Sequence, residues 1–214
     1  MAGQQVLDRV LDPDQGNNPE DEALLADSVS RALLVVLDTL QPAERIAFVL
    51  HDMFAVPFDE IAPIVERTPV ATKKLASRAR RKVQGTPVVA AAELSRHRQV
   101  VSAFLAAARA GDLTAILAVL APGVVRRADP AALPPGAAAE LHGARAVAEG
   151  TVALARRSQF ADLVLVNGAV GLVMAPRGQL LLALTFTTKD DKIVGYEVIA
   201  DPARLRQLSF SVLD

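Results

Sequence analysis

Residues 67–83 read Arg-Thr-Pro-Val-Ala-Thr-Lys-Lys-Leu-Ala-Ser-Arg-Ala-Arg-Arg-Lys-Val. The stretch begins like a helix, because Thr68 is a favourable N-cap residue and Pro69 suits the first helical position. Gly85, just beyond the stretch, is typical of a helix end. Six of the ten residues from 73 to 82 are basic and none is acidic. The sequence therefore predicts a capped, strongly basic helix over residues 69–83.

The basic helix is part of an uneven charge distribution along the chain. The 214 residues have a formal net charge of only -1. Residues 1–66 hold 3 basic and 13 acidic side chains, residues 67–109 hold 10 and 1, and residues 110–214 hold 10 of each. Positive charge concentrated in one segment favours a polyanionic partner. Two alternatives stay open: a solvated basic face, or a face covered by the acidic N-terminal half.

The composition narrows the class of protein. Hydrophobic residues make up 51% of the chain, which suffices for the cores of one large domain or two small ones. The absence of Cys excludes disulfides, thiolate metal sites and Cys nucleophiles. No apolar run approaches the roughly 20 residues that span a bilayer, and the start of the chain does not resemble a signal peptide. We expect a cytoplasmic protein with no membrane partner, no metal site and no cofactor.

Four helices are expected before Gly85. Asn18 and Pro19 mark the start of the first helix. Pro63 disfavours the third helix, because a Pro inside a helix costs roughly 3 kcal/mol, so that helix should be kinked or begin late. We expect a polar tail at 1–18 and a helix-turn-helix domain at 19–84, with helices over about 19–37, from Pro42 to about 50, over about 58–66, and over 69–83.

The pattern changes after residue 95. Residues 85–95 are rich in Gly, Pro and Ala, so we expect a linker there. Helices followed by a meander of strands predict an α+β domain over 96–214. Its expected helices cover about 96–110, 112–120 and 143–158, with a last one after Asp201-Pro202; its expected strands cover 124–128, 160–166, 169–175, 179–187 and 192–199.

Residues 19–83 resemble region 4 of bacterial sigma factors of the extracytoplasmic-function type. The resemblance lies in Leu-Asp-Thr-Leu-Gln-Pro-Ala-Glu-Arg-Ile-Ala-Phe-Val-Leu (37–50), Phe-Asp-Glu-Ile-Ala (58–62) and Leu-Ala-Ser-Arg-Ala-Arg-Arg-Lys-Val (75–83). It implies a helix-turn-helix module that binds the minus-thirty-five element of promoter DNA and the RNA polymerase core during transcription initiation.

Residues 96–209 resemble SnoaL-like domains. The resemblance lies in the two opening helices, the segment Gly143-Ala-Arg-Ala-Val-Ala, and the ending Ile199-Ala-Asp-Pro-Ala-Arg-Leu. It implies a cystatin/NTF2-like cone, in which a curved antiparallel sheet encloses an apolar cavity. Region 4 followed by such an extension is similar to a subgroup of sigma factors.

No segment of the chain resembles region 2, which opens the promoter in that family. Residues 1–18 look like the end of the linker between regions 2 and 4. The chain is then either a piece of a longer sigma factor or a protein that lacks region 2, and the sequence leaves both readings open. By this resemblance, the chain alone is expected not to start transcription.

Residues that contact bases are expected in the first turns of the basic helix, because a helix-turn-helix places its second helix in the major groove. Ala71, Leu75 and Ala79 repeat every four residues and are expected to pack inward. Later cations in the helix suit phosphates, which contribute affinity but little sequence information. The candidate DNA-binding residues are Thr68, Thr72, Lys73, Lys74, Ser77, Arg78 and Arg81.

An enzyme would need titratable side chains that converge in the cavity of the second domain. The candidate cavity residues are Arg127, His142 and Tyr196. His142 adjoins a turn and is equally explained as an exposed or capping residue. We find no acid–base pair and name no catalytic residue, so a regulatory extension is expected. The alternative function is a cavity protein that senses or transforms a small apolar molecule.

Overall fold

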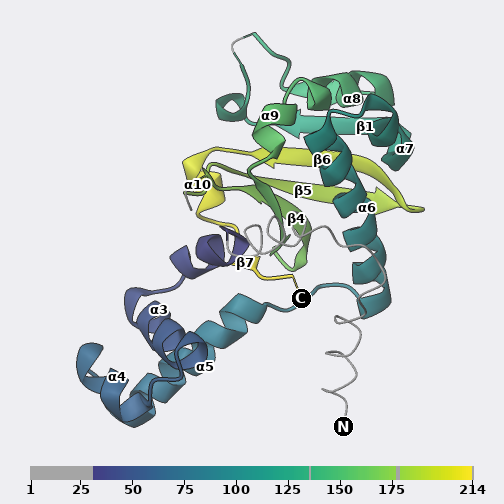
Figure 1. Ribbon diagram of the computed structural model, residues 1–214. Helices are drawn as coiled ribbons and strands as arrows, with labels where there is room; N and C mark the ends of the chain where they lie inside the picture. The colour runs from purple at the N-terminus through teal and green to yellow at the C-terminus, as the bar shows by residue number, and fades with distance from the viewer. Residues whose placement is uncertain (1–30, 135, 177–178, 214) are drawn as a thin grey trace.

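The structure is a computed structural model, and it describes residues 31–134, 136–176 and 179–213 (Figure 1). A helical part comes first along the chain, and an α+β part follows it. The expected tail at 1–18 and the start of the first helix lie outside the described residues. Within the described part of the chain, no helix has the length and hydropathy needed to cross a membrane.

The helical part contains the expected elements. Residues 31–38 are helical, and the chain continues through α3 (Pro42–Phe48), the π-helical turn η1 (Val49–Met53), α4 (Phe58–Ile64) and α5 (Pro69–Gln84). Pro63 lies in the last turn of α4, which ends one residue later. The Pro therefore shortens this helix, and the expected kink or late start is not needed.

The α+β part contains more helices than expected. α6 (Ala91–Ala110) begins earlier than the expected position near 96, so the linker between α5 and α6 is confined to residues 85–90. The helix expected over 143–158 is divided into two, because the chain leaves helical geometry near Leu154. The remaining elements are α7 (Leu113–Val119), the short η2 (Pro130–Ala132), α8 (Ala144–Val152), α9 (Ala155–Ser158) and α10 (Pro202–Leu205).

The strands form one sheet in the order β2-β1-β6-β5-β4-β3-β7. Neighbouring strands are antiparallel except for β1 and β6, which are parallel. A sheet that is antiparallel throughout was expected. One parallel pair arises because the chain passes from β2 to β3 on the other side of the sheet and returns through β4 and β5, which places β6 beside β1. The strands are β1 (Leu120–Ala128), β2 (Glu140–His142), β3 (Ala161–Val166), β4 (Ala169–Met174), β5 (Leu182–Lys189), β6 (Lys192–Ile199) and β7 (Phe210–Ser211).

Both faces of the sheet are covered. α6, α7 and α8 lie on one face, and the helix at 31–38 lies on the other; α5 reaches the sheet beside β7, and α3 packs on α5 (Figure 1). In β3, Val164 and Val166 contribute to the core shared with the helical part, whereas Leu163 and Leu165 contribute to the other core. Side chains alternate between the two faces of a strand. The consecutive apolar residues of β3 therefore reflect burial on two sides, and not a single closed interior.

Hydrogen bonds also join the two parts. The Val212 amide, just after β7, donates to the Val83 carbonyl at 2.7 Å, and the Val88 amide donates to the Gly168 carbonyl at 3.0 Å. At Gly85, where φ is 63°, a Cβ atom would lie 2.0 Å from the Ser211 hydroxyl oxygen. Only glycine fits this close approach. The end of α5 is thus attached to the last strand of the sheet.

Candidate nucleic-acid interface and cavity

The buried face of α5 differs from the expected one by about one residue. The buried side chains are Thr72, Ala76, Ala79 and Val83, spaced by four, three and four residues. That spacing averages close to the 3.6 residues of one helical turn, so these side chains stay on one face of α5. The expected residues repeat every four positions, and such a repeat moves gradually away from a single face. Thr72 is 0% exposed, and its hydroxyl donates to the Thr68 carbonyl at 3.0 Å. The expectation that Thr72 contacts bases is therefore wrong.

Four of the candidate residues form an exposed surface that we call the α5 basic face: Lys73, Lys74, Ser77 and Arg81. Within the described residues, their side chains have no hydrogen-bond or ion-pair partner. Thr68, the residue before α5, is the N-cap of this helix as expected. Its hydroxyl oxygen accepts a hydrogen bond from the Ala71 amide at 3.2 Å. The cap and the exposed face place positive charge at the start of a well-defined helix.

Other cations of α5 already have carboxylate partners in the helical part. Arg78 and Lys82 both donate to Glu44 of α3, at 3.1 and 2.7 Å, and Arg80 pairs with Asp52 of η1. Glu44 is only 5% exposed. The acidic N-terminal half thus neutralises the later turns of α5 and leaves the α5 basic face open. Arg78 remains half-exposed, so a phosphate would have to share it with Glu44.

The environment of Glu44 determines a pH dependence. Burial alone raises the pKa of Glu44, but the hydrogen bonds from Lys82 and Arg78 outweigh it and hold this pKa below its ordinary value. A carboxyl with a lowered folded-state pKa stabilises the fold above its unfolded-state pKa of about 4.3, and this stabilisation is lost as the pH falls.

We expect the Glu44→Gln variant to unfold with a free energy about 1–2 kcal/mol lower than wild type at neutral pH, because two charge-assisted hydrogen bonds are weakened. The difference should begin to shrink as the pH falls below about 4.3, the ordinary pKa of this carboxyl, and should disappear only below the lowered pKa of Glu44, where wild type is protonated as well. Urea unfolding at both pH values measures it. Glu149→Gln, which affects an exposed pair with Arg145, is the control. An equal loss at both pH values would contradict the assigned ion pairs.

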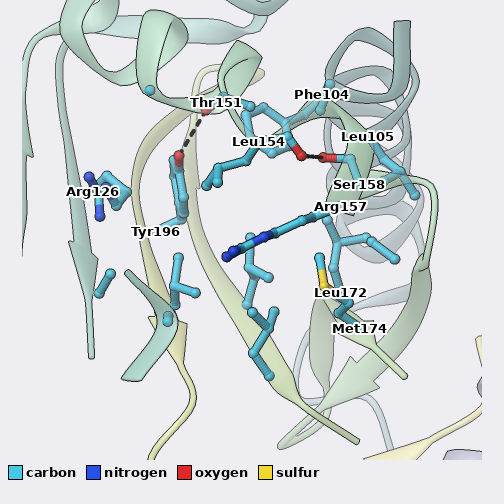
Figure 2. Close-up of a pocket in the computed structure, with 18 of the residues that line it drawn as sticks. Phe104, Leu105, Arg126, Thr151, Leu154, Arg157, Ser158, Leu172, Met174 and Tyr196 are labelled. Atoms are coloured by element: carbon cyan, nitrogen blue, oxygen red, sulfur yellow. Dashed lines mark hydrogen bonds between the residues drawn. The ribbon is translucent and has the colours of Figure 1, made fainter. Parts of the chain in front are cut away.

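The α+β part contains a cavity of about 90 Å³ (Figure 2). Its walls come from α6, α8, α9 and strands β1, β3, β4, β5 and β6. Tyr196 lines it as expected and is 9% exposed. The Tyr196 hydroxyl lies 3.1 Å from the Thr151 hydroxyl oxygen. Burial raises the pKa of Tyr196, so this hydroxyl stays protonated at neutral pH.

The other two candidate cavity residues are placed elsewhere. Arg127 forms an ion pair with Glu140 at 3.1 Å at the surface, and His142 lies 2.8 Å from the same carboxylate with its side chain 68% exposed. Arg126 lines the cavity in place of Arg127. Val124 and Arg126 are both buried because residues two apart in a strand share a face. Side chains alternate between the two faces of a strand, so counting from the buried Val124 would have identified Arg126, and not Arg127, as the arginine on the buried face.

Carboxylates near the end of the sheet have a structural role. Asp129 accepts hydrogen bonds from the amides of Ala200 and Asp201, both at 2.9 Å, and pairs with Arg204. Burial raises the pKa of Asp129, but these hydrogen bonds outweigh it and lower the pKa overall. Arg204 also bonds Glu197 at 2.7 Å. These groups attach α10 to the sheet, and they form no acid–base pair in the cavity.

Comparison with known proteins agrees with this arrangement. Residues 30–83 match the family described as Sigma-70, region 4. Over 112 residues, 52% of this chain, the sequence is 42% identical to the probable ECF RNA polymerase sigma factor SigI of Mycobacterium tuberculosis, and it covers 39% of that protein. It is 33% identical to the ECF RNA polymerase sigma factor SigJ of the same organism over 203 residues, 86% of this chain and 64% of SigJ. The chain thus spans less than two thirds of both relatives.

Solved structures give similar matches. The crystal structure of SigJ from Mycobacterium tuberculosis covers 79% of this chain and 62% of its own, at 32% identity and a TM-score of 0.44. A SnoaL-like protein from Burkholderia thailandensis covers 49% of this chain and 94% of its own, at 19% identity and a TM-score of 0.38. In sequence, the chain is similar to the extracytoplasmic-function sigma factors SigI and SigJ, and its residues 30–83 match sigma-70 region 4.

Proposed function

We propose that this chain acts in transcription initiation as a sigma-factor-type protein, which binds the minus-thirty-five element of promoter DNA and the RNA polymerase core. The observation that carries the proposal is the α5 basic face: an exposed, unpaired set of polar and basic side chains on the second helix of a region 4 helix-turn-helix. Such a helix lies in the major groove with its first turns at the base edges.

The two halves of α5 have different roles in this proposal. Lys73, Lys74 and Ser77 lie in the first turns and contact base edges. Arg81 and the half-exposed Arg78 lie later and contact phosphates. Thr68, the N-cap, positions the start of the helix. Sequence information is therefore concentrated in the first half of the helix, where the side chains have no acidic partner among the described residues.

Exposed apolar side chains support a protein partner for the helical part. Met53 ends η1 and Phe54 follows it, Ile64 ends α4, and Val70 lies in the first turn of α5; all four are exposed. Exposed apolar side chains in one small helical unit favour a surface for protein binding. We assign the RNA polymerase core as that partner.

We assign a regulatory role, and no catalytic one, to the α+β domain. Its sheet packs against the helical part through a shared core, so its conformation can influence the position of α5. Among the described residues that line its cavity, the charged side chains are arginines, and no carboxylate or imidazole joins them. In terms of domains, we propose 19–84 for DNA binding, 85–90 as the connecting segment and 91–214 for regulation, since α6 begins at Ala91 and not near residue 96.

Titration of a labelled duplex with the full chain tests the proposal. The two phosphate contacts assigned to Arg78 and Arg81 predict a slope of about -2 for log K against log salt, which amounts to roughly a 15-fold loss of affinity between 50 and 200 mM salt. Fluorescence anisotropy with a duplex containing a minus-thirty-five element, and with a shuffled duplex, measures affinity and specificity. Absence of binding at low salt, or binding that salt does not weaken, would refute the proposed function.

A further inference from the structure

We propose that the cavity of the α+β domain binds a small carboxylic acid, with the carboxylate on Arg126 and the apolar body between α6 and the sheet. The inference concerns a site separate from the DNA-binding surface, and it does not depend on the proposed role of α5. The ligand class follows from the charge, the burial and the size of the cavity.

Arg126 provides the first argument. It is only 9% exposed, and within the described residues it has neither an ion-pair nor a hydrogen-bond partner. A buried cation without an ion-pair partner is costly, and the apolar side chains around it cannot offset its charge. Arg126 lines the cavity, where a bound anion can supply the missing charge and accept two parallel hydrogen bonds from the guanidinium. A bound acid offsets this cost.

The remaining lining supports an anion at one end and an apolar body at the other. Arg157 of α9 extends toward the cavity from the side opposite β1 (Figure 2). No Asp or Glu lines the cavity among the described residues, so its charge is positive. The hydroxyls of Thr151 and Tyr196 are bonded to each other. The other walls are apolar, including Phe104, Leu172 and Leu184, which favour a hydrocarbon body.

The size of the cavity limits the ligand. Its volume of about 90 Å³ is below the roughly 150 Å³ of an apolar cavity that takes up benzene. A short branched acyl chain suits this volume, and a single ring fits only if part of it extends past Arg157. We therefore choose isovalerate as the probe, with its neutral amide, isovaleramide, as the matched uncharged molecule.

The test is calorimetric titration of the full chain with each probe. Wild type is expected to bind isovalerate at least tenfold more tightly than isovaleramide. Arg126→Met should lose at least tenfold in affinity for isovalerate and little for the amide, because only the charge contact is removed. Arg126→Lys, which keeps the charge but not the two-pronged contact, should be intermediate.

Arg127→Met is the matched control, since Arg127 neighbours Arg126 on β1 but is paired with Glu140 at the surface. It should bind isovalerate like wild type. A melting curve of each variant checks the fold, and Arg126→Met is expected to be at least as stable as wild type because a buried unpaired charge is gone. The proposal is overturned if acid and amide bind equally, if Arg126→Met binds the acid like wild type, or if wild type binds no isovalerate up to about 10 mM.

Discussion

Replacing Asp162 by Ala is expected to lower the free energy of unfolding by about 3 kcal/mol. Asp162 is 1% exposed on β3 and accepts two hydrogen bonds from Arg31, at 2.9 and 3.0 Å. Arg109 at the end of α6 also contacts this carboxylate, at 3.4 Å. Removing the carboxylate leaves the two guanidinium groups near each other without their shared anion, which is why the expected loss is large.

Urea unfolding measures this prediction as a shift of the midpoint at constant slope. Arg31 belongs to the helical part and Asp162 to the sheet, so the variant should weaken the attachment between them. Glu149→Ala is the control, because it removes an exposed pair with Arg145 and should change the stability by less than about 0.5 kcal/mol. If Asp162→Ala is as mild as this control, the buried ion pair does not stabilise the fold.

Replacing both Lys73 and Lys74 by Ala is expected to weaken DNA binding by roughly 30-fold or more. Each lost contact to a base edge costs about 1–3 kcal/mol, and 1.4 kcal/mol corresponds to a factor of ten. If the two side chains instead contact phosphates, the salt slope should become shallower by about 2. The stability should not change, because both side chains are exposed and have no partner among the described residues.

Two controls make the DNA-binding experiment decisive. Arg145→Ala combined with Arg156→Ala removes the same charge from α8 and α9, away from α5, and should bind DNA nearly like wild type. Thr72→Val tests the corrected face of α5: Thr72 is buried, so base preference should be unchanged. Equal binding by the Lys73/Lys74 double variant and wild type at low and high salt would show that α5 is not the DNA-binding helix.

Local signals in the sequence were enough for the element boundaries that depend on a few neighbouring residues. Thr68 and Gly85 delimit α5, and Asp112 and Asp201 accept hydrogen bonds from the first amides of α7 and α10, as expected. The turn Asn167-Gly168 separates β3 from β4. Caps and turns act within three or four residues, so their chemistry can be read directly from the chain.

Side-chain orientation was predicted only in part. The exposure of Lys73 and Lys74 and the place of Tyr196 in the cavity are as expected, whereas Thr72 and Arg127 point away from the expected sites. The errors at Thr72 and Arg127 are shifts of one residue, whereas His142 lies at the surface beside Glu140. A helix turns about 100° per residue and a strand 180°, so one step moves a side chain from one face toward another.

The tertiary structure alone decided how the two parts of the chain meet. Arg31 and Asp162 are separated by 131 residues, and Glu44 and Arg78 by 34. No local pattern indicates that the Asp162 carboxylate lies between the helices and the sheet, or that the Glu44 carboxylate neutralises the later turns of α5. The composition of 1–66 and 67–109 predicted opposite charges, but only the packed helices determine which cations are paired and which remain free to contact DNA, because ion pairing depends on distances in space.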